Sequence, residues 1–160
     1  DIPMNTLELL HAPLAQPERE RDAALAESQR STQAHGAAQS QADQLVAYRR
    51  DYEQRYAEKF KQEGGMELLH VYRSFMDRLN VAVDQQQRVA QHTHLKAEQA
   101  RAALIEQEVR VASVRKLIER RQHEARLAAD RRDQKQTDEF AARASSLRQS
   151  LLSADGVRLV

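Results

Sequence analysis

The sequence of 160 residues contains no cysteine, which excludes disulfide frameworks, thiol nucleophiles and cysteine-ligated zinc sites. Aromatic residues make up only 4% of the chain, and its 4 glycines and 3 prolines are few, so we expect neither a thick globular core nor a loop-rich fold. The formal net charge of +1 gives no general attraction to nucleic acid. Apolar runs such as residues 102–105 fall far short of the roughly 20 residues that span a bilayer. We therefore expect a cytoplasmic helical protein that is not inserted into a membrane.

Motifs for catalysis or metal binding are also missing. The sequence has no glycine loop of the GxxxxGK[ST] or GxGxxG type and no His-Glu-x-x-His spacing. The closest histidines, His92 and His94, are two positions apart, which puts them on different faces of a helix. We therefore expect no catalytic residue, no metal site and no cofactor, and we interpret the protein as a non-enzyme.

What the chain does contain is an apolar residue at every seventh position over a long stretch. A repeat of seven keeps one narrow stripe of a helix facing a partner helix, which is the pattern of a coiled-coil seam. The surrounding residues are mainly Arg, Gln, Glu and Ala, which form helices readily. The predicted seam consists of Leu69, Met76, Val83, Ala90, Ala97, Leu104, Val111, Ile118 and Ala125.

The adjacent glycines at 64 and 65 divide the helical sequence into two parts. We expect an N-terminal extension over residues 1–16, short-helical or irregular because Pro13 and Pro17 interrupt it. One coiled-coil domain should follow over residues 17–152. Its predicted parts are a helix over 17–62 that begins at Pro17, a turn over 63–65, a helix over 66–152, and then a flexible tail over 153–160.

The predicted fold class is all-α, with two long helices forming an antiparallel coiled-coil hairpin. If the chain folds back at the glycine pair, the residue numbers of partners should sum to about 129, so that Tyr52 faces the region of Met76. The C-terminal helix is then the longer one and overhangs the first. Its apolar positions beyond residue 112 need a cover. An external partner is one candidate, and residues 4–16 folded back are the other.

Six of the seven aromatic residues fall within residues 48–75, on either side of the glycine pair. Three of them belong to stripes with spacings of three and four, one stripe in each helix. One interpretation is that the two stripes pack the hairpin. The other is that part of their aromatic surface stays exposed as an anchor for another protein. The stripes comprise Gln41, Leu45, Tyr48 and Tyr52 in the first helix, and Phe75, Leu79, Ala82 and Gln86 in the second.

The segment from Arg131 to Ala144 resembles the C-terminal signature of the flagellar FliJ family. In that signature an Asp-Gln-Lys sequence and an Asp-Glu pair precede a large apolar residue, as at Phe140 here. The spaced Tyr and Phe positions on both sides of the turn are similar to the middle region of the family, and Glu20 to Leu25 is similar to its N-terminal helix. The resemblance covers roughly residues 18–146.

This resemblance implies a stalk-like component of the flagellar type III export apparatus, in the cytoplasm and peripherally associated with the inner membrane. It implies binding to the hexameric export ATPase (FliI-like), to its regulator (FliH-like) and to the cytoplasmic domain of the export-gate protein (FlhA-like), and possible contact with export chaperones. The stripes of the two helices named above would meet the gate, although a histidine is associated with the family position that Gln86 occupies. The residues expected at the ATPase ring are Arg131, Arg132, Asp133, Lys135, Asp138, Glu139 and Phe140.

Three other interpretations stay open from the residues alone. The chain could be the equivalent stalk of a virulence-type injectisome, which has the same shape in another machine. It could be a structural or escort coiled coil that binds export components or dimerises through its seam without regulating an ATPase. A basic coiled coil on nucleic acid is the third, although no separate basic region precedes the heptads.

Overall fold

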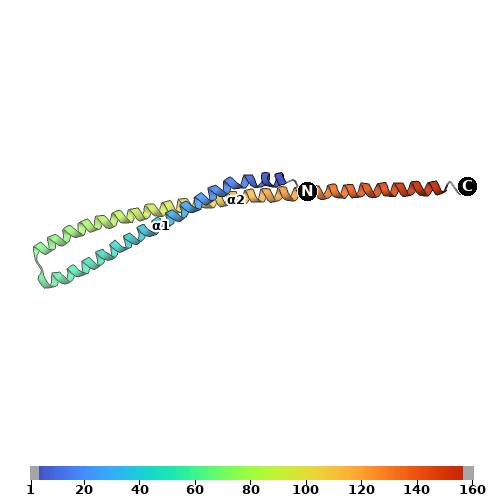
Figure 1. The fold of residues 1–160 in the computed structure, drawn as a ribbon. Coiled ribbons are helices and arrows are strands. Elements are labelled where there is room, and N and C mark those ends of the chain that lie inside the picture. The colour runs from blue at the N-terminus through green and yellow to red at the C-terminus, as the bar shows by residue number, and fades with distance from the viewer. Residues whose placement is uncertain (1–3, 157–160) are drawn as a thin grey trace. The chain divides into compact units, whose positions relative to one another are not determined.

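The computed structural model describes the backbone of residues 4–156 and the side chains of residues 13–156. Two helices account for nearly all of this part of the chain: α1 over Met4–Glu63, with 60 residues, and α2 over Met66–Gly156, with 91 residues. Figure 1 shows them joined by a short turn. The predicted all-α class and the pair of packed long helices are confirmed.

The first helix starts earlier than we expected, at Met4 rather than at Pro17. It runs through Pro13 and Pro17, each of which lacks the N–H that would bond to the carbonyl four residues before it. Because Pro17 follows Pro13 by four residues, both lost bonds lie in the same row along the helix axis. The other rows stay continuous, so two prolines so close to the N-terminus do not end the helix.

By its contacts the chain divides into two compact units, and α2 belongs to both. One unit comprises residues 12–112 and contains the turn and the helical hairpin. Among the described residues, the other comprises 4–11 together with 113–156. In the second unit Ile118 is buried, whereas every residue from 130 to 156 is exposed.

The turn between the helices depends on its first glycine. A β-carbon on Gly64 would lie 3.0 Å from the carbonyl oxygen of Phe60, whereas one on Gly65 would meet nothing within 4 Å. The α2 helix then begins at once, with the amide of Leu69 donating to the carbonyl oxygen of Gly65 at 3.2 Å. Glu67 in the first turn of α2 and Lys61 in the last turn of α1 carry the charges that the helix dipoles favour.

Contacts between α1 and α2 within residues 12–112 confirm the antiparallel register. Arg49 Nη1 donates to Asn80 Oδ1 at 3.1 Å. Farther from the turn, Arg110 forms an ion pair with Glu20. The residue numbers of these two pairs sum to 129 and 130, as expected for a fold back at the glycine pair.

The heptad stripe of α2 is buried over much of the hairpin. Val83 is only 1% exposed, and Met76, Ala90 and Val111 are also buried. Leu69, Ala97 and Leu104 at the same heptad position are half-buried, and Ala125 is exposed. A second stripe of α2 lies beside the first. It contains the buried Leu79 and the half-buried polar residues Gln86, Thr93 and Gln107.

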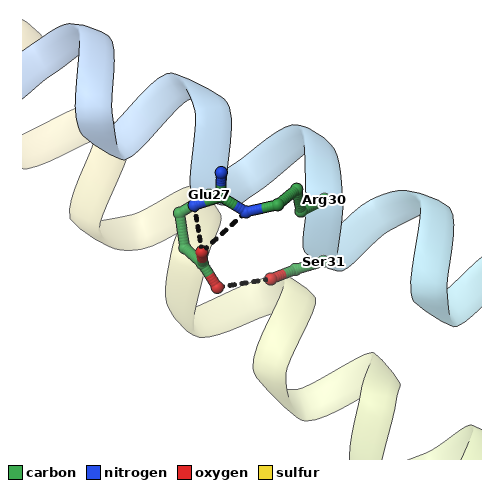
Figure 2. Close-up of polar contacts among 3 residues, drawn as sticks. All are labelled: Glu27, Arg30 and Ser31. Carbon is green, nitrogen blue, oxygen red and sulfur yellow. Dashed lines mark hydrogen bonds and ion pairs between the residues drawn. The ribbon is translucent and has the colours of Figure 1, made fainter.

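The facing stripe of α1 consists of small residues. Ala38 and Ala42 are buried and form one core cluster with Ala90 of α2. A buried polar residue, Ser31, stands one heptad before Ala38. Its hydroxyl donates to Glu27 Oε1 at 3.3 Å, so the buried oxygen has a partner (Figure 2).

Glu27 is held in turn by its neighbour along the helix. Arg30 donates to Glu27 Oε2 from Nη2 at 2.7 Å and from Nε at 3.2 Å (Figure 2). These hydrogen bonds and the charge of the guanidinium lower the pKa of the Glu27 carboxyl from its ordinary value. The carboxylate is therefore kept in the form that accepts the Ser31 hydroxyl.

Candidate functional site

An aromatic cluster joins the two helices next to the turn. The ring of Tyr52 lies against Phe75, with centroids 4.2 Å apart, and against Tyr72 in a stacked arrangement at 6.1 Å. Tyr56 is closer to Tyr72, at 4.7 Å. Tyr48 meets Phe75 edge-on at 6.4 Å. The cluster therefore combines rings from α1 with rings from α2. Its stacked, tilted and edge-on pairs are of the kinds that aromatic side chains prefer.

Tyr52 is the central ring of this cluster, and its position there raises the pKa of its phenol. Burial raises the pKa of the Tyr52 phenol to about 12, with further contributions from a hydrogen bond with Tyr56 and from the nearby phenols of Tyr48 and Tyr72. The phenol thus stays neutral in the folded protein well above the pH at which an ordinary tyrosine ionises.

The structure brings together the eight residues predicted to face the export gate. They occupy the facing sides of α1 and α2 within the unit of residues 12–112. Their exposure differs: Gln41 is exposed, Tyr48 is 49% exposed and Leu79 is buried at 7%. The other five are half-buried, namely Leu45, Tyr52, Phe75, Ala82 and Gln86.

Gln86 takes part in the contact between the helices rather than standing free on the surface. Its Nε2 donates to the backbone oxygen of Ala38 at 3.3 Å and to Gln41 Oε1 at 3.1 Å. One amide group therefore ties α2 to two residues of α1. It also orients Gln41, whose side chain lies at the edge of the same surface.

The residues predicted to meet the ATPase ring all lie on α2 and are all exposed. Arg131, Lys135, Asp138 and Glu139 border one shallow hollow of about 440 Å³ on the helix surface. Their spacings of four, three and one place them on one side of the helix. Phe140 beside them is 76% exposed, which is a large apolar area for a residue of a polar helix. Arg132 and Asp133 are exposed as well and lie outside the residues lining the hollow.

Only Leu45 and Tyr52 of the packing stripe of α1 were predicted from the sequence, because its other members are small or polar. Ala24, Ser31, Ala38, Leu45 and Tyr52 follow each other at seven-residue intervals, and so do Ser28, His35 and Ala42. The expected sum of 129 for the residue numbers of facing partners could have predicted one further pair across the hairpin. It places His35 opposite His94, and in the structure the centroids of these two rings are 5.1 Å apart.

No helix within residues 4–156 has the length and apolar character needed to cross a membrane. In comparisons with known proteins, the family model described as "Flagellar FliJ protein" matches residues 10–150. Searches of the curated proteins and of the solved structures give no match. The family match covers most of both helices, the aromatic cluster and the predicted ATPase residues of α2. The chain therefore belongs to the flagellar FliJ family and is a component of flagellar type III protein export.

Proposed function

We propose that this protein is a stalk-like coiled coil that binds the hexameric export ATPase, promotes its assembly and activity, and links it to the membrane export gate. The proposal rests on the family match, which covers residues 10–150, and on resemblance in the two regions described above. One observation supports the ATPase contact most directly. From residue 130 to residue 156 every residue of α2 is exposed, so this part of the helix presents side chains on all sides.

On this proposal, charged residues and one aromatic anchor share the work of binding the ring. The basic groups of Arg131 and Lys135 and the acidic groups of Asp138 and Glu139 supply charges of both signs. Phe140 supplies apolar area that water covers in the free protein. A ligand changes the activity of a ring only if it binds the states of its subunits unequally, so the stalk acts by favouring some states over others.

The gate contact is proposed on the edge of the aromatic cluster. Gln41 and Tyr48 offer exposed surface, whereas Leu79 is buried and holds the helices together. The half-buried rings of Tyr52 and Phe75 contact the ring of Tyr48 and hold it in position. Direct binding to the gate therefore falls to Gln41 and Tyr48, and the other members of the set act by keeping these two in place.

The experiment that tests the ATPase role measures hydrolysis rate and hexamer content of the cognate export ATPase with and without this protein. We expect stimulation by the full chain and its loss in a chain truncated after Arg120. The variant Phe140→Ala should lose part of the stimulation while keeping the helix content and melting temperature of the parent, because its side chain is 76% exposed.

Leu151→Ala provides a matched control, since Leu151 is an apolar residue of the same helix with 63% exposure and lies outside the predicted contact. Equal losses for Phe140→Ala and Leu151→Ala would show that the apolar surface matters without the proposed specificity. No effect of the full chain on the ATPase would favour a structural or escort coiled coil.

A further inference from the structure

Two histidines from different helices lie side by side in the hairpin. The ring centroids of His35 on α1 and His94 on α2 are 5.1 Å apart, with 56° between the ring planes. Both rings line a groove of about 730 Å³ between the helices. The rest of the lining is mainly polar and consists of Gln39, Gln87 and Gln91 with Ala90 and Leu95.

The hydrogen bonds of Thr93 favour one tautomer of His35. Thr93 Oγ1 lies 2.9 Å from the carbonyl oxygens of both Val89 and Ala90, so its hydroxyl hydrogen is donated to the backbone. The same oxygen lies 3.5 Å from His35 Nδ1, toward which it can then only accept. This contact favours the tautomer of His35 that has its proton on Nδ1 and its lone pair on Nε2.

A carboxylate decides the same question for His94. Its Nε2 lies 3.2 Å from Oε1 of Glu98, one turn further along α2. An ionised carboxylate only accepts hydrogen bonds, so the proton of the neutral ring sits on Nε2. This arrangement leaves the lone pair on Nδ1 of His94. Each ring thus has one nitrogen bound to a partner on α2 and one nitrogen with no hydrogen bond to a described residue.

Each of these histidines shares one feature with a metal-binding imidazole, an oxygen partner on one of its two nitrogens. A ligating imidazole usually donates its second N–H to a carboxylate or another oxygen, which fixes the tautomer and the ring orientation. Metal–nitrogen distances of about 2.0–2.1 Å put the centres of two imidazoles on one tetrahedral ion roughly 5 Å apart. We propose that His35 and His94 bind a divalent transition-metal ion such as Zn²⁺ and that this ion links α1 to α2.

The site is expected to be open and of modest affinity. Among the residues that the structure describes, no group of three or more His, Cys, Asp or Glu side chains is placed to hold a metal. The ion therefore has two protein ligands, and water fills its remaining positions in the groove. Imidazole ligands select Zn²⁺, Cu²⁺ and Ni²⁺ over Mg²⁺ and Ca²⁺, which prefer oxygen.

The position of the site gives the ion a mechanical role. The neighbouring core consists of Ala38, Ala42 and Ala90, whose side chains bury little apolar area. A bond from each helix to one ion would hold the helices together where their packing residues are small. This inference concerns the hairpin itself and is independent of the contacts proposed with the ATPase and the gate.

The test is calorimetric titration of the full-length protein, without an affinity tag, with ZnCl₂ and separately with MgCl₂. We expect one Zn²⁺ per chain and no binding of Mg²⁺. The variants His35→Gln and His94→Gln should each weaken Zn²⁺ binding about tenfold or more. His92→Gln should leave it unchanged, because His92 is exposed on another side of α2. Circular dichroism without metal checks that each variant keeps its helices.

A spectroscopic measurement on the parent protein tests the ligands even if a variant fails to fold. With one equivalent of Cu²⁺, the electron paramagnetic resonance spectrum should show hyperfine coupling to two imidazole nitrogens, and the His92→Gln variant should show the same. Coupling to fewer than two nitrogens in the parent would overturn the proposal. So would folded His35→Gln and His94→Gln variants that bind Zn²⁺ as tightly as the parent.

Discussion

The ring of Tyr52 on α1 lies 4.2 Å from that of Phe75 on α2, centroid to centroid, with 43° between their planes. This pair closes the aromatic cluster next to the turn, where α1 and α2 have the largest side chains of the hairpin to pack. Farther from the turn the facing residues are Ala38, Ala42 and Ala90. The aromatic pair should therefore supply a large share of the stability of the hairpin.

Phe75→Ala is expected to lower the free energy of unfolding by about 2 kcal/mol, less than the cost at a fully buried site because the ring is half-buried. Tyr48→Ala, at a ring that is 49% exposed, should cost less than about 1 kcal/mol. Urea unfolding followed by circular dichroism at 222 nm measures both. Equal losses for the two variants would contradict a central role for the Tyr52–Phe75 pair.

The pKa of Tyr52 predicts a loss of stability at alkaline pH. In the unfolded chain the phenol ionises near its ordinary value of 10.0, whereas in the folded protein it stays neutral up to about 12. Between these values the unfolded state is stabilised relative to the folded state, because it releases a proton that the folded state keeps. The contribution of Tyr52 is therefore complete below pH 10 and is lost as the pH rises from 10 to 12. Urea unfolding at several pH values across this range measures the effect. The free energy of unfolding should fall less steeply with pH for Tyr52→Phe than for the parent.

Gln107 marks a place where the hairpin can be stabilised. Its Oε1 is buried and has no hydrogen-bond partner among the described residues. Replacing a buried, unpaired polar group by an apolar one of similar size removes a desolvation cost, so Gln107→Leu should raise the free energy of unfolding by about 1 kcal/mol. Gln99→Leu, at an exposed position of the same helix, is the control and should change it by less than about 0.5 kcal/mol. No gain from Gln107→Leu in thermal melting would mean that this oxygen is solvated.

The glycines differ in what they tolerate. Gly36 is inside α1 and a β-carbon there would meet nothing within 4 Å, so Gly36→Ala should stabilise the protein by about 0.5–1 kcal/mol. Gly64→Ala should destabilise it, because the new carbon would lie 3.0 Å from a backbone oxygen. Thermal melting measures both changes. A gain at Gly64 would show that the turn relaxes easily.

Two valines on α2 allow the buried seam and the exposed face of the helix to be compared. Val83 is 1% exposed, so Val83→Ala should lower the free energy of unfolding by about 1–2 kcal/mol. Val81 is 56% exposed, so Val81→Ala should change it by less than about 0.5 kcal/mol. Chemical denaturation distinguishes these values, and similar losses at both positions would argue against the observed rotation of α2 about its axis.

Much of the fold could be predicted because it depends on local chemistry. Helix-forming residues, a seven-residue apolar repeat and one glycine pair determine two helices and the place where the chain folds back. That place sets the register, since each residue must pair at the same distance from the turn, as Arg49 and Asn80 do. The family resemblance likewise depended on residues that can be read one by one, such as those around Phe140.

The tertiary structure decided what residue type and spacing leave undetermined. It showed that α1 continues through Pro13 and Pro17, that Ala125 is exposed although it continues the heptad, and that Leu79 is buried within the predicted gate surface. It also brought His35 to His94 and oriented both rings through Thr93 and Glu98. The physical reason is that helix formation and register depend on neighbours along the chain. Burial and side-chain pairing depend instead on which atoms of the other helix lie opposite, and only the packed hairpin determines that.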